Sequence, residues 1–152
     1  MRCIERLAIL VCLSVLALPT WAHAADDNTP DAESIAALQA KISDAQPRDR
    51  CFLYARLIHQ ITEYSVQQHA AGDVTHTNIL LKEVQTLAKK LHLTVSENDK
   101  RLKSTEILLR HSAFRLQELL HASSYDEQPL VEQTLTQVNK ADDAAMMQLF
   151  QK

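Results

Sequence analysis

Apolar residues recur at alternating steps of three and four over most of the chain, a spacing that places side chains on one face of an α-helix. The longest such pattern runs from Glu97 to Ser123. One stripe of this segment predicts the buried seam of a helical bundle: Leu102, Thr105, Leu109, Ser112, Leu116, Leu119 and Ser123. The opposite stripe alternates apolar and ionisable residues, and it is where candidate chemistry gathers: Ile107, His111, Phe114, Glu118 and His121.

The same spacing predicts a short helix at 30–45 and three more long helices, at about Arg48 to Ala71, at about Val74 to Leu93, and after an Asp126 cap near the C-terminus. Thr29 is the predicted cap of the short helix, with Pro30 in its first turn, and Pro47 ends it.

Gly72 and Asp73 separate two of the long helices. A glycine can end a helix in the left-handed conformation without strain, and an aspartate can cap the next helix. We therefore expect a tight reversal between antiparallel neighbours. Ser96 and Asp99 have the spacing of a capping box, which predicts that the next helix begins at about Glu97.

These patterns predict an all-α fold: a left-handed, up-down-up-down four-helix bundle with a short extra N-terminal helix. We place the bundle domain at 47–152, after a loose N-terminus and the short helix at 25–46. The single glycine and the low aromatic content of 5% argue against a sheet.

The first 24 residues have the features of a cleaved signal peptide. Arg2 and Arg6 precede the apolar run Leu7 to Leu18, which is too short to span a bilayer. Small residues at Ala22 and Ala24 predict cleavage after Ala24. The protein is therefore expected to be exported, to the periplasm or outside the cell, with no integral membrane segment after cleavage.

Charge and motifs exclude several functional classes. Removal of 1–24 lowers Lys plus Arg from 16 to 14 and Asp plus Glu from 19 to 18, so the net charge becomes about −4. That value gives no case for nucleic-acid binding. The sequence has no glycine-rich phosphate loop, no Gly-x-Ser-x-Gly and no Cys-x-x-Cys-His, so we expect neither an enzyme nor a cofactor.

Cys51 is the one cysteine that remains after cleavage, because Cys3 and Cys12 belong to the signal peptide. An intrachain disulfide is thus excluded. The main expectation is a buried thiol near a helix start; a reactive thiol or an intermolecular disulfide is the alternative.

The last helix carries a carboxylate in its predicted seam of Val131, Leu135, Val138, Asp142, Ala145 and Leu149. Counting turns from the shared end of the bundle places Asp142 level with Ser112. We expect either a polar pair in which Ser112 donates a hydrogen bond to Asp142 and fixes the helix register, or a partly exposed Asp142. A ligand or metal contact inside the bundle is the alternative.

Glu118 and His121 have the Glu-x-x-His spacing that places two metal ligands on one helical face. His59 and Glu63 form a similar pair on the back of the first long helix. If the two faces meet, five side chains become a candidate transition-metal site: His59, Glu63, His111, Glu118 and His121. Both faces lie opposite the predicted seams, which favours contact with water or another element instead.

Apolar residues on these back faces predict a contact surface: Phe52, Val66, Ile107 and Phe114. The sequence therefore favours an exported, non-enzymatic helical bundle that acts through contact with a protein partner or through self-association. The alternative is a periplasmic bundle that binds a metal or a small ligand.

Overall fold

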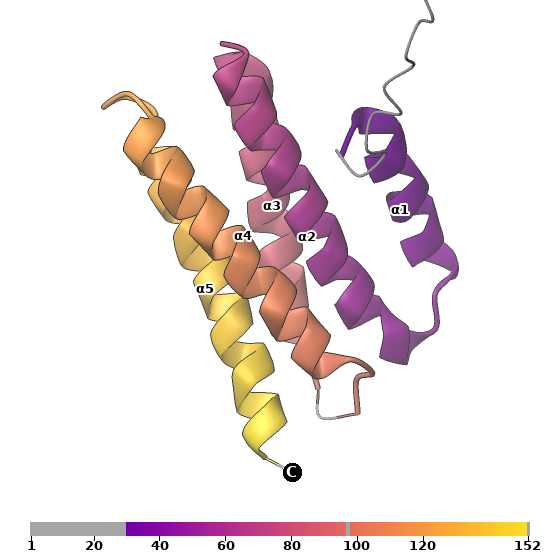
Figure 1. The fold of residues 1–152 in the computed structure, drawn as a ribbon. Helices are drawn as coiled ribbons and strands as arrows, with labels where there is room; N and C mark the ends of the chain where they lie inside the picture. The colour runs from indigo at the N-terminus through magenta and orange to yellow at the C-terminus, as the bar shows by residue number, and fades with distance from the viewer. Residues whose placement is uncertain (1–29, 97, 152) are drawn as a thin grey trace, which may run out of the picture.

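The computed structural model of the protein describes residues 30–96 and 98–151. Over these ranges the chain forms five α-helices and no β-strand: α1 (Ala32–Asp44), α2 (Pro47–Ala70), α3 (Val74–Thr94), α4 (Leu102–Ala122) and α5 (Gln128–Phe150) (Figure 1). The all-α prediction is confirmed. The predicted signal peptide at 1–24 and the predicted cap Thr29 lie outside the described residues. None of the helices in the described ranges is both long and apolar enough to cross a membrane.

The helix α1 begins later than predicted. Its N-cap is Asp31, whose carboxylate accepts a hydrogen bond from Ser34 N at 2.7 Å, while Asp31 N donates to Ser34 Oγ at 3.1 Å. Pro30 thus precedes the cap. Pro47 does not merely follow α1 but occupies the first turn of α2, where its missing N–H costs nothing.

The reversal between α2 and α3 has the predicted form. Gly72 has a φ of 84°, and the Asp73 side chain accepts a hydrogen bond from His76 N at 2.9 Å. Gly72 N also donates to His69 O at 2.9 Å, which satisfies a carbonyl at the end of α2. The α2–α3 pair is therefore a closed hairpin.

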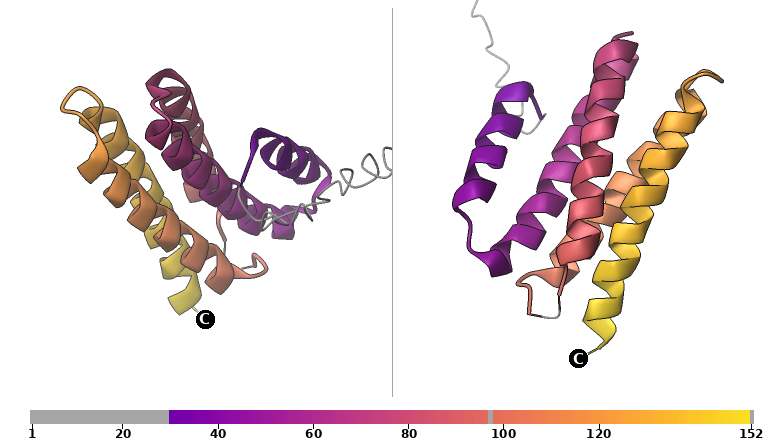
Figure 2. Two further views of the ribbon diagram at one scale, coloured as in Figure 1. Left: turned by 45° about the horizontal axis from the view of Figure 1, so that its top comes forward. Right: turned by 180° about the vertical axis from the view of Figure 1, so that it is seen from behind.

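The four long helices pack as two hairpins side by side. The helix α2 contacts α3 and α4, and α5 also contacts α3 and α4, whereas α3 and α4 do not touch. The consecutive helices α3 and α4 therefore lie at diagonally opposite corners of the four-helix arrangement. The helix α1 packs mainly on α2, on the side away from the α4–α5 hairpin (Figure 2).

The connection between α3 and α4 is longer than predicted, because it crosses this diagonal. Ser96 N does donate to Asp99 Oδ2, at 2.7 Å, but that bond closes a turn and α4 begins only at Leu102. Lys100 N donates to Arg48 O at 2.9 Å, and Arg48 Nε donates to Asn98 O at 3.0 Å. The connection is thus fastened to the start of α2.

The predicted seam of the α4 segment is buried at every position: Leu102, Thr105, Leu109, Ser112, Leu116, Leu119 and Ser123. The predicted seam of α5 is partly wrong. Thr134 and Ala141 are buried in place of Leu135 and Asp142, which are half-buried at the edge of the core. Small residues form much of the buried face of α5. The helix is therefore turned slightly about its axis relative to the orientation that would bury its largest apolar side chains. The predicted cap Asp126 is also wrong, because Glu127 is the N-cap.

Candidate functional site

The α2–α4 interface holds a cluster of ionisable side chains centred on Arg115. Arg115 Nε donates to both carboxylate oxygens of Glu63, at 2.9 and 3.1 Å, and its Nη1 pairs with Glu118 one turn further along α4. A guanidinium suits this position because its planar fork can serve two carboxylates at once. Arg115 therefore joins the two predicted glutamates and also links α2 to α4.

Two histidines meet beside this cluster. The rings of His59 on α2 and His111 on α4 lie 6.3 Å apart between centroids, with planes tilted by 57°. His59 Nδ1 is buried and has no hydrogen-bond partner in the described part of the chain. Burial lowers the pKa of His59, Glu63 opposes that effect, and His111 and Arg115 lower the pKa further. The net effect favours the neutral form of the His59 imidazole.

The structure thus brings together four of the five predicted metal-ligating residues: His59, Glu63, His111 and Glu118. It does so with a cation in their midst, because Arg115 engages both carboxylates. His121 is exposed in the last turn of α4. No three His, Cys, Asp or Glu residues in the described ranges are arranged to hold a metal ion.

A groove of about 500 Å³ runs between α2 and α4 next to the histidines. Its lining includes the apolar side chains of Phe52, Ile107 and Leu108 and the polar side chains of His59, Gln60 and two arginines, Arg56 and Arg101. The Arg101 guanidinium lies over the Phe52 ring, with its Cζ 4.9 Å from the ring centroid. The groove is cationic, since its one carboxylate, Glu63, is already paired with Arg115.

The four residues of the predicted contact surface divide into two kinds. Phe52 and Val66 are half-buried and pack against the core, so much of their apolar area is already covered. Ile107 and Phe114 on α4 are 42% and 61% exposed. A free apolar surface therefore exists on α4, while its expected counterpart on α2 is largely used within the chain.

The expected hydrogen bond from Ser112 to Asp142 is absent from the described residues. The Ser112 hydroxyl instead donates to Leu108 O, one turn back in its own helix, at 2.8 Å. Asp142 Oδ1 is buried without a partner. Its neighbours are Glu106 and Arg110 on α4 and Asp143 on α5, and Glu106 is only 7% exposed and pairs with Arg110. Burial, and next the charge of Glu106, raises the pKa of Asp142 to about 6.

Cys51 is 3% exposed, in the second turn of α2. Burial is the main cause that raises the pKa of its thiol to about 12, and the nearby carboxylate of Asp99 adds to it. A thiol with that pKa is protonated and unreactive at neutral pH. The buried position matches the main expectation from the sequence.

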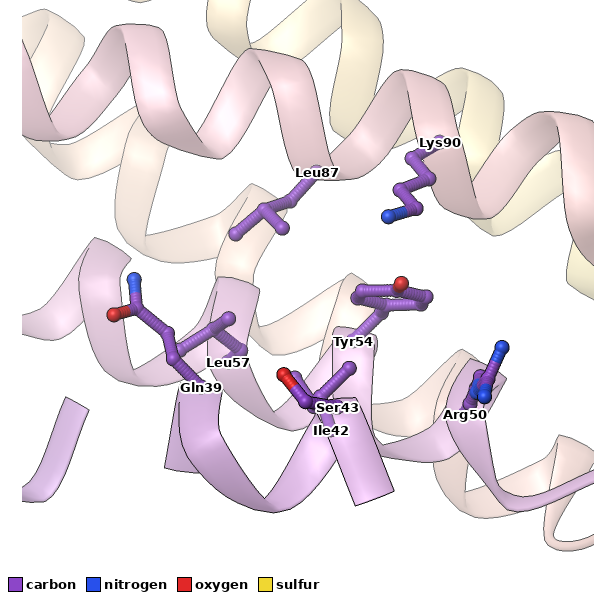
Figure 3. Close-up of a pocket in the computed structure, with 8 residues that line it drawn as sticks. All are labelled: Gln39, Ile42, Ser43, Arg50, Tyr54, Leu57, Leu87 and Lys90. Atoms are coloured by element: carbon purple, nitrogen blue, oxygen red, sulfur yellow. The ribbon is translucent and has the colours of Figure 1, made fainter. Parts of the chain in front are cut away.

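A second cavity, of about 320 Å³, lies where α1 meets α2 and α3, and it was not expected from the sequence. Figure 3 shows Lys90 of α3 reaching toward the ring of Tyr54 on α2, with its Nζ 5.0 Å from the ring centroid. Gln39 Nε2 on the rim donates to Glu83 Oε1 at 2.6 Å and so connects α1 to α3. The cavity therefore lies at the interface between α1 and the α2–α3 hairpin.

Three residues that matter most here were missed from the sequence: Arg101, Glu106 and Arg115. For two of them a local signal exists, since Glu106 and Arg110 are four residues apart and Arg115 and Glu118 are three apart, the spacings of helical ion pairs. No such signal marks Arg101, whose role depends on the position of α2.

In comparisons with known proteins, no family model, no curated protein and no solved structure matches this chain. Its function has to be inferred from its own residues and their arrangement.

Proposed function

We propose that this protein is an exported, non-enzymatic helical bundle that acts through protein contact, and that it self-associates through the outer face of α4. We define this face by its exposed side chains Lys103, Ile107, Arg110, His111, Phe114, Glu118 and His121. The observation that carries the proposal is the exposure of Ile107 and Phe114, 42% and 61%. Large apolar side chains seven residues apart on a helix exposed to water are typical of a helix–helix contact.

The order of residues on the outer face of α4 favours a second copy of the chain as the partner. An antiparallel pair of α4 helices, related by a two-fold axis near Arg110 and His111, would place Ile107 opposite Phe114 of the second copy. The same axis would place Lys103 opposite Glu118 of the second copy. Apolar groups then meet on either side of Arg110 and His111, and opposite charges meet farther from the axis, which makes the two faces self-complementary.

The four long helices would serve as a rigid support for this face. We propose that these helices have the left-handed, up-down-up-down arrangement expected from the sequence. One helix face buries less than the roughly 800 Å² per partner of a standard interface, so we expect association in the micromolar range and not an obligate dimer.

Sedimentation velocity over a range of concentrations tests the proposal. The sample is the chain from Ala25 onward, which retains all five helices. We expect a concentration-dependent dimer that Phe114→Glu abolishes while the helical circular dichroism is unchanged. The matched control is Phe150→Glu, which places the same charge at another exposed aromatic position, 83% exposed at the end of α5. A monomer at every concentration would refute the proposal.

A charge swap gives a second, independent test of the two-fold geometry. Lys103→Glu alone, or Glu118→Lys alone, should weaken the dimer through like-charge repulsion across the axis. The double variant should restore it, because each new lysine again meets a glutamate. Failure of the double variant to recover would argue against the antiparallel pairing.

Export is tested by the mass of the protein recovered from outside the cytoplasm. We expect a chain that begins at Ala25. Recovery of a chain that still begins at Met1 would contradict this part of the proposal.

The small-ligand alternative also has an observation in its favour, the cationic groove between α2 and α4. Its metal-binding form has less support, because Arg115 already occupies Glu63 and Glu118.

A further inference from the structure

The groove between α2 and α4 is lined by both cationic and apolar side chains. Its volume of about 500 Å³ is within the range of pockets that take small organic ligands. The large apolar side chains of its lining are Phe52, Ile107 and Leu108. Such a surface suits a molecule that has a charged head and a hydrocarbon body.

The two arginines of the groove differ from the paired arginines of the same interface. Arg110 and Arg115 each form an ion pair with a glutamate, whereas neither Arg56 nor Arg101 has a carboxylate within 4.0 Å in the described part of the chain. Arg101 contacts an aromatic face instead. Their donors are therefore available to an incoming anion.

The backbone of Arg101 has a left-handed conformation, which is unfavourable for an arginine. Its φ is 59°, and no other non-glycine residue in the described ranges has a positive φ. Arg101 is the N-cap residue of α4, yet its side chain makes no capping bond. A glycine or asparagine would suit this backbone better, and strained positions of this kind concentrate at binding sites.

Polar atoms next to the groove lack partners within the chain. His59 Nδ1 and Gln60 Oε1 are both buried without a hydrogen bond in the described part of the molecule. Both atoms are closed off from solvent, so they lie behind the surface of the groove and the groove's exposed donors are those of its arginines.

We propose that this groove binds an organic anion built from a carboxylate and an acyl chain. The carboxylate lies between Arg56 and Arg101 and accepts hydrogen bonds from their guanidinium groups. The chain lies along Phe52, Ile107 and Leu108. This site shares Ile107 with the outer face of α4 but does not include Phe114, which does not line the groove.

Calorimetric titration with dodecanoate at pH 7.5 and 150 mM salt tests the site, with the probe kept below its micelle concentration. We expect one saturable site per chain. Two related probes separate the contributions: acetate lacks the acyl chain and dodecanol lacks the charge, and each should bind at least tenfold more weakly. Equal binding of dodecanol and dodecanoate would overturn the proposal, because it would reduce the groove to an apolar patch.

Arg101→Gly is the decisive variant. It removes the guanidinium and relieves the positive φ, so it should raise the melting temperature while it weakens dodecanoate binding at least tenfold. A loss of binding accompanied by a gain in stability cannot come from misfolding. Unchanged dodecanoate affinity in Arg101→Gly would overturn the proposal.

Two controls separate this site from general charge and from self-association. Lys82→Gln removes one positive charge from an exposed position on α3 and should change the affinity less than twofold. Phe114→Glu should abolish the dimer and retain dodecanoate binding. Arg101→Gly should weaken dodecanoate binding and retain the dimer. Loss of dodecanoate binding in both control variants would mean that no defined site exists.

Discussion

The carboxylate of Asp142 on α5 lies close to that of Glu106 on α4, so two acidic side chains share the edge of one helix interface. Arg110 pairs with Glu106 and offsets one of the two charges, and Asp142 Oδ1 is left buried without a partner. Burial and the charge of Glu106 raise the pKa of Asp142 to about 6, as expected when a carboxylate is desolvated near a like charge.

Asp142→Asn should stabilise the protein at pH 8. The folded state holds the proton of Asp142 more tightly than the unfolded chain, whose aspartates titrate near 3.9. Wild-type stability should therefore fall as the pH rises from about 4 through 6, and the asparagine variant should not share this loss. We expect a gain of about 1 kcal/mol at pH 8, a value that allows for the screening of a half-exposed group, and no gain near pH 4. Urea unfolding measures both.

The neighbouring Asp143→Asn is the control for Asp142, because it removes the same charge from an exposed position. It should change the stability by less than about 0.5 kcal/mol. An equal effect of the two substitutions would mean that general charge repulsion, and not the contact with Glu106, sets the cost.

Arg115→Ala should lower the free energy of unfolding by about 1–2 kcal/mol, because it leaves Glu63 and Glu118 without their shared cation. Arg115→Lys should recover only part of the loss, since an ammonium cannot donate two parallel bonds to one carboxylate. Arg56→Ala is the matched control and should cost less, as Arg56 makes no ion pair among the described residues. Equal losses at both positions would show that Arg115 does not link the two helices.

Gly72→Ala should destabilise the α2–α3 hairpin by about 1 kcal/mol. A Cβ at this position meets no atom within 4 Å, so the cost comes from the φ of 84° alone. Gly72→Asn should cost less, because asparagine tolerates the left-handed region better than alanine does. Thermal unfolding of the three proteins gives the order, and an alanine variant as stable as the wild type would contradict it.

The Cys51 thiol should be inert in the folded protein. With its pKa raised to about 12 and the side chain buried, labelling by a thiol reagent at pH 8 should be at least about a hundredfold slower than in urea. Fast labelling of the native protein would revive the alternative of a reactive thiol. A dimer that a reducing agent dissociates would point to an intermolecular disulfide.

The helices and most of their inner faces follow from sequence periodicity. The seam of α4 was predicted at every position, and Gly72 and Asp73 mark their turn because each has one conformational role there. The start of α4 was predicted wrongly because the same local sequence pattern is compatible with two structures. Ser96 and Asp99 close a turn with the same hydrogen bond that would cap a helix, so their spacing alone cannot locate the start of α4.

The candidate site was only partly predictable, because it depends on which helices are neighbours. His59 and His111 lie away from the buried seams, and the sequence therefore favoured contact with water or another element. Each long helix lies beside two of the other long helices, so residues on its flank also make contacts, and α2 lies beside α4. That adjacency follows from the diagonal between α3 and α4, which depends on packing across the whole chain.

The diagonal connection, described at 95–96 and 98–101, would also determine how two molecules exchange parts. Each hairpin is complete in itself, and one strap of chain joins the two. If this connection moved away from α2, the α4–α5 hairpin of one molecule could pack on the α2–α3 hairpin of another. The result would be a domain-swapped dimer with two copies of the same core. The bonds from Arg48 and Lys100 hold this connection against α2, so their loss should favour such an exchange.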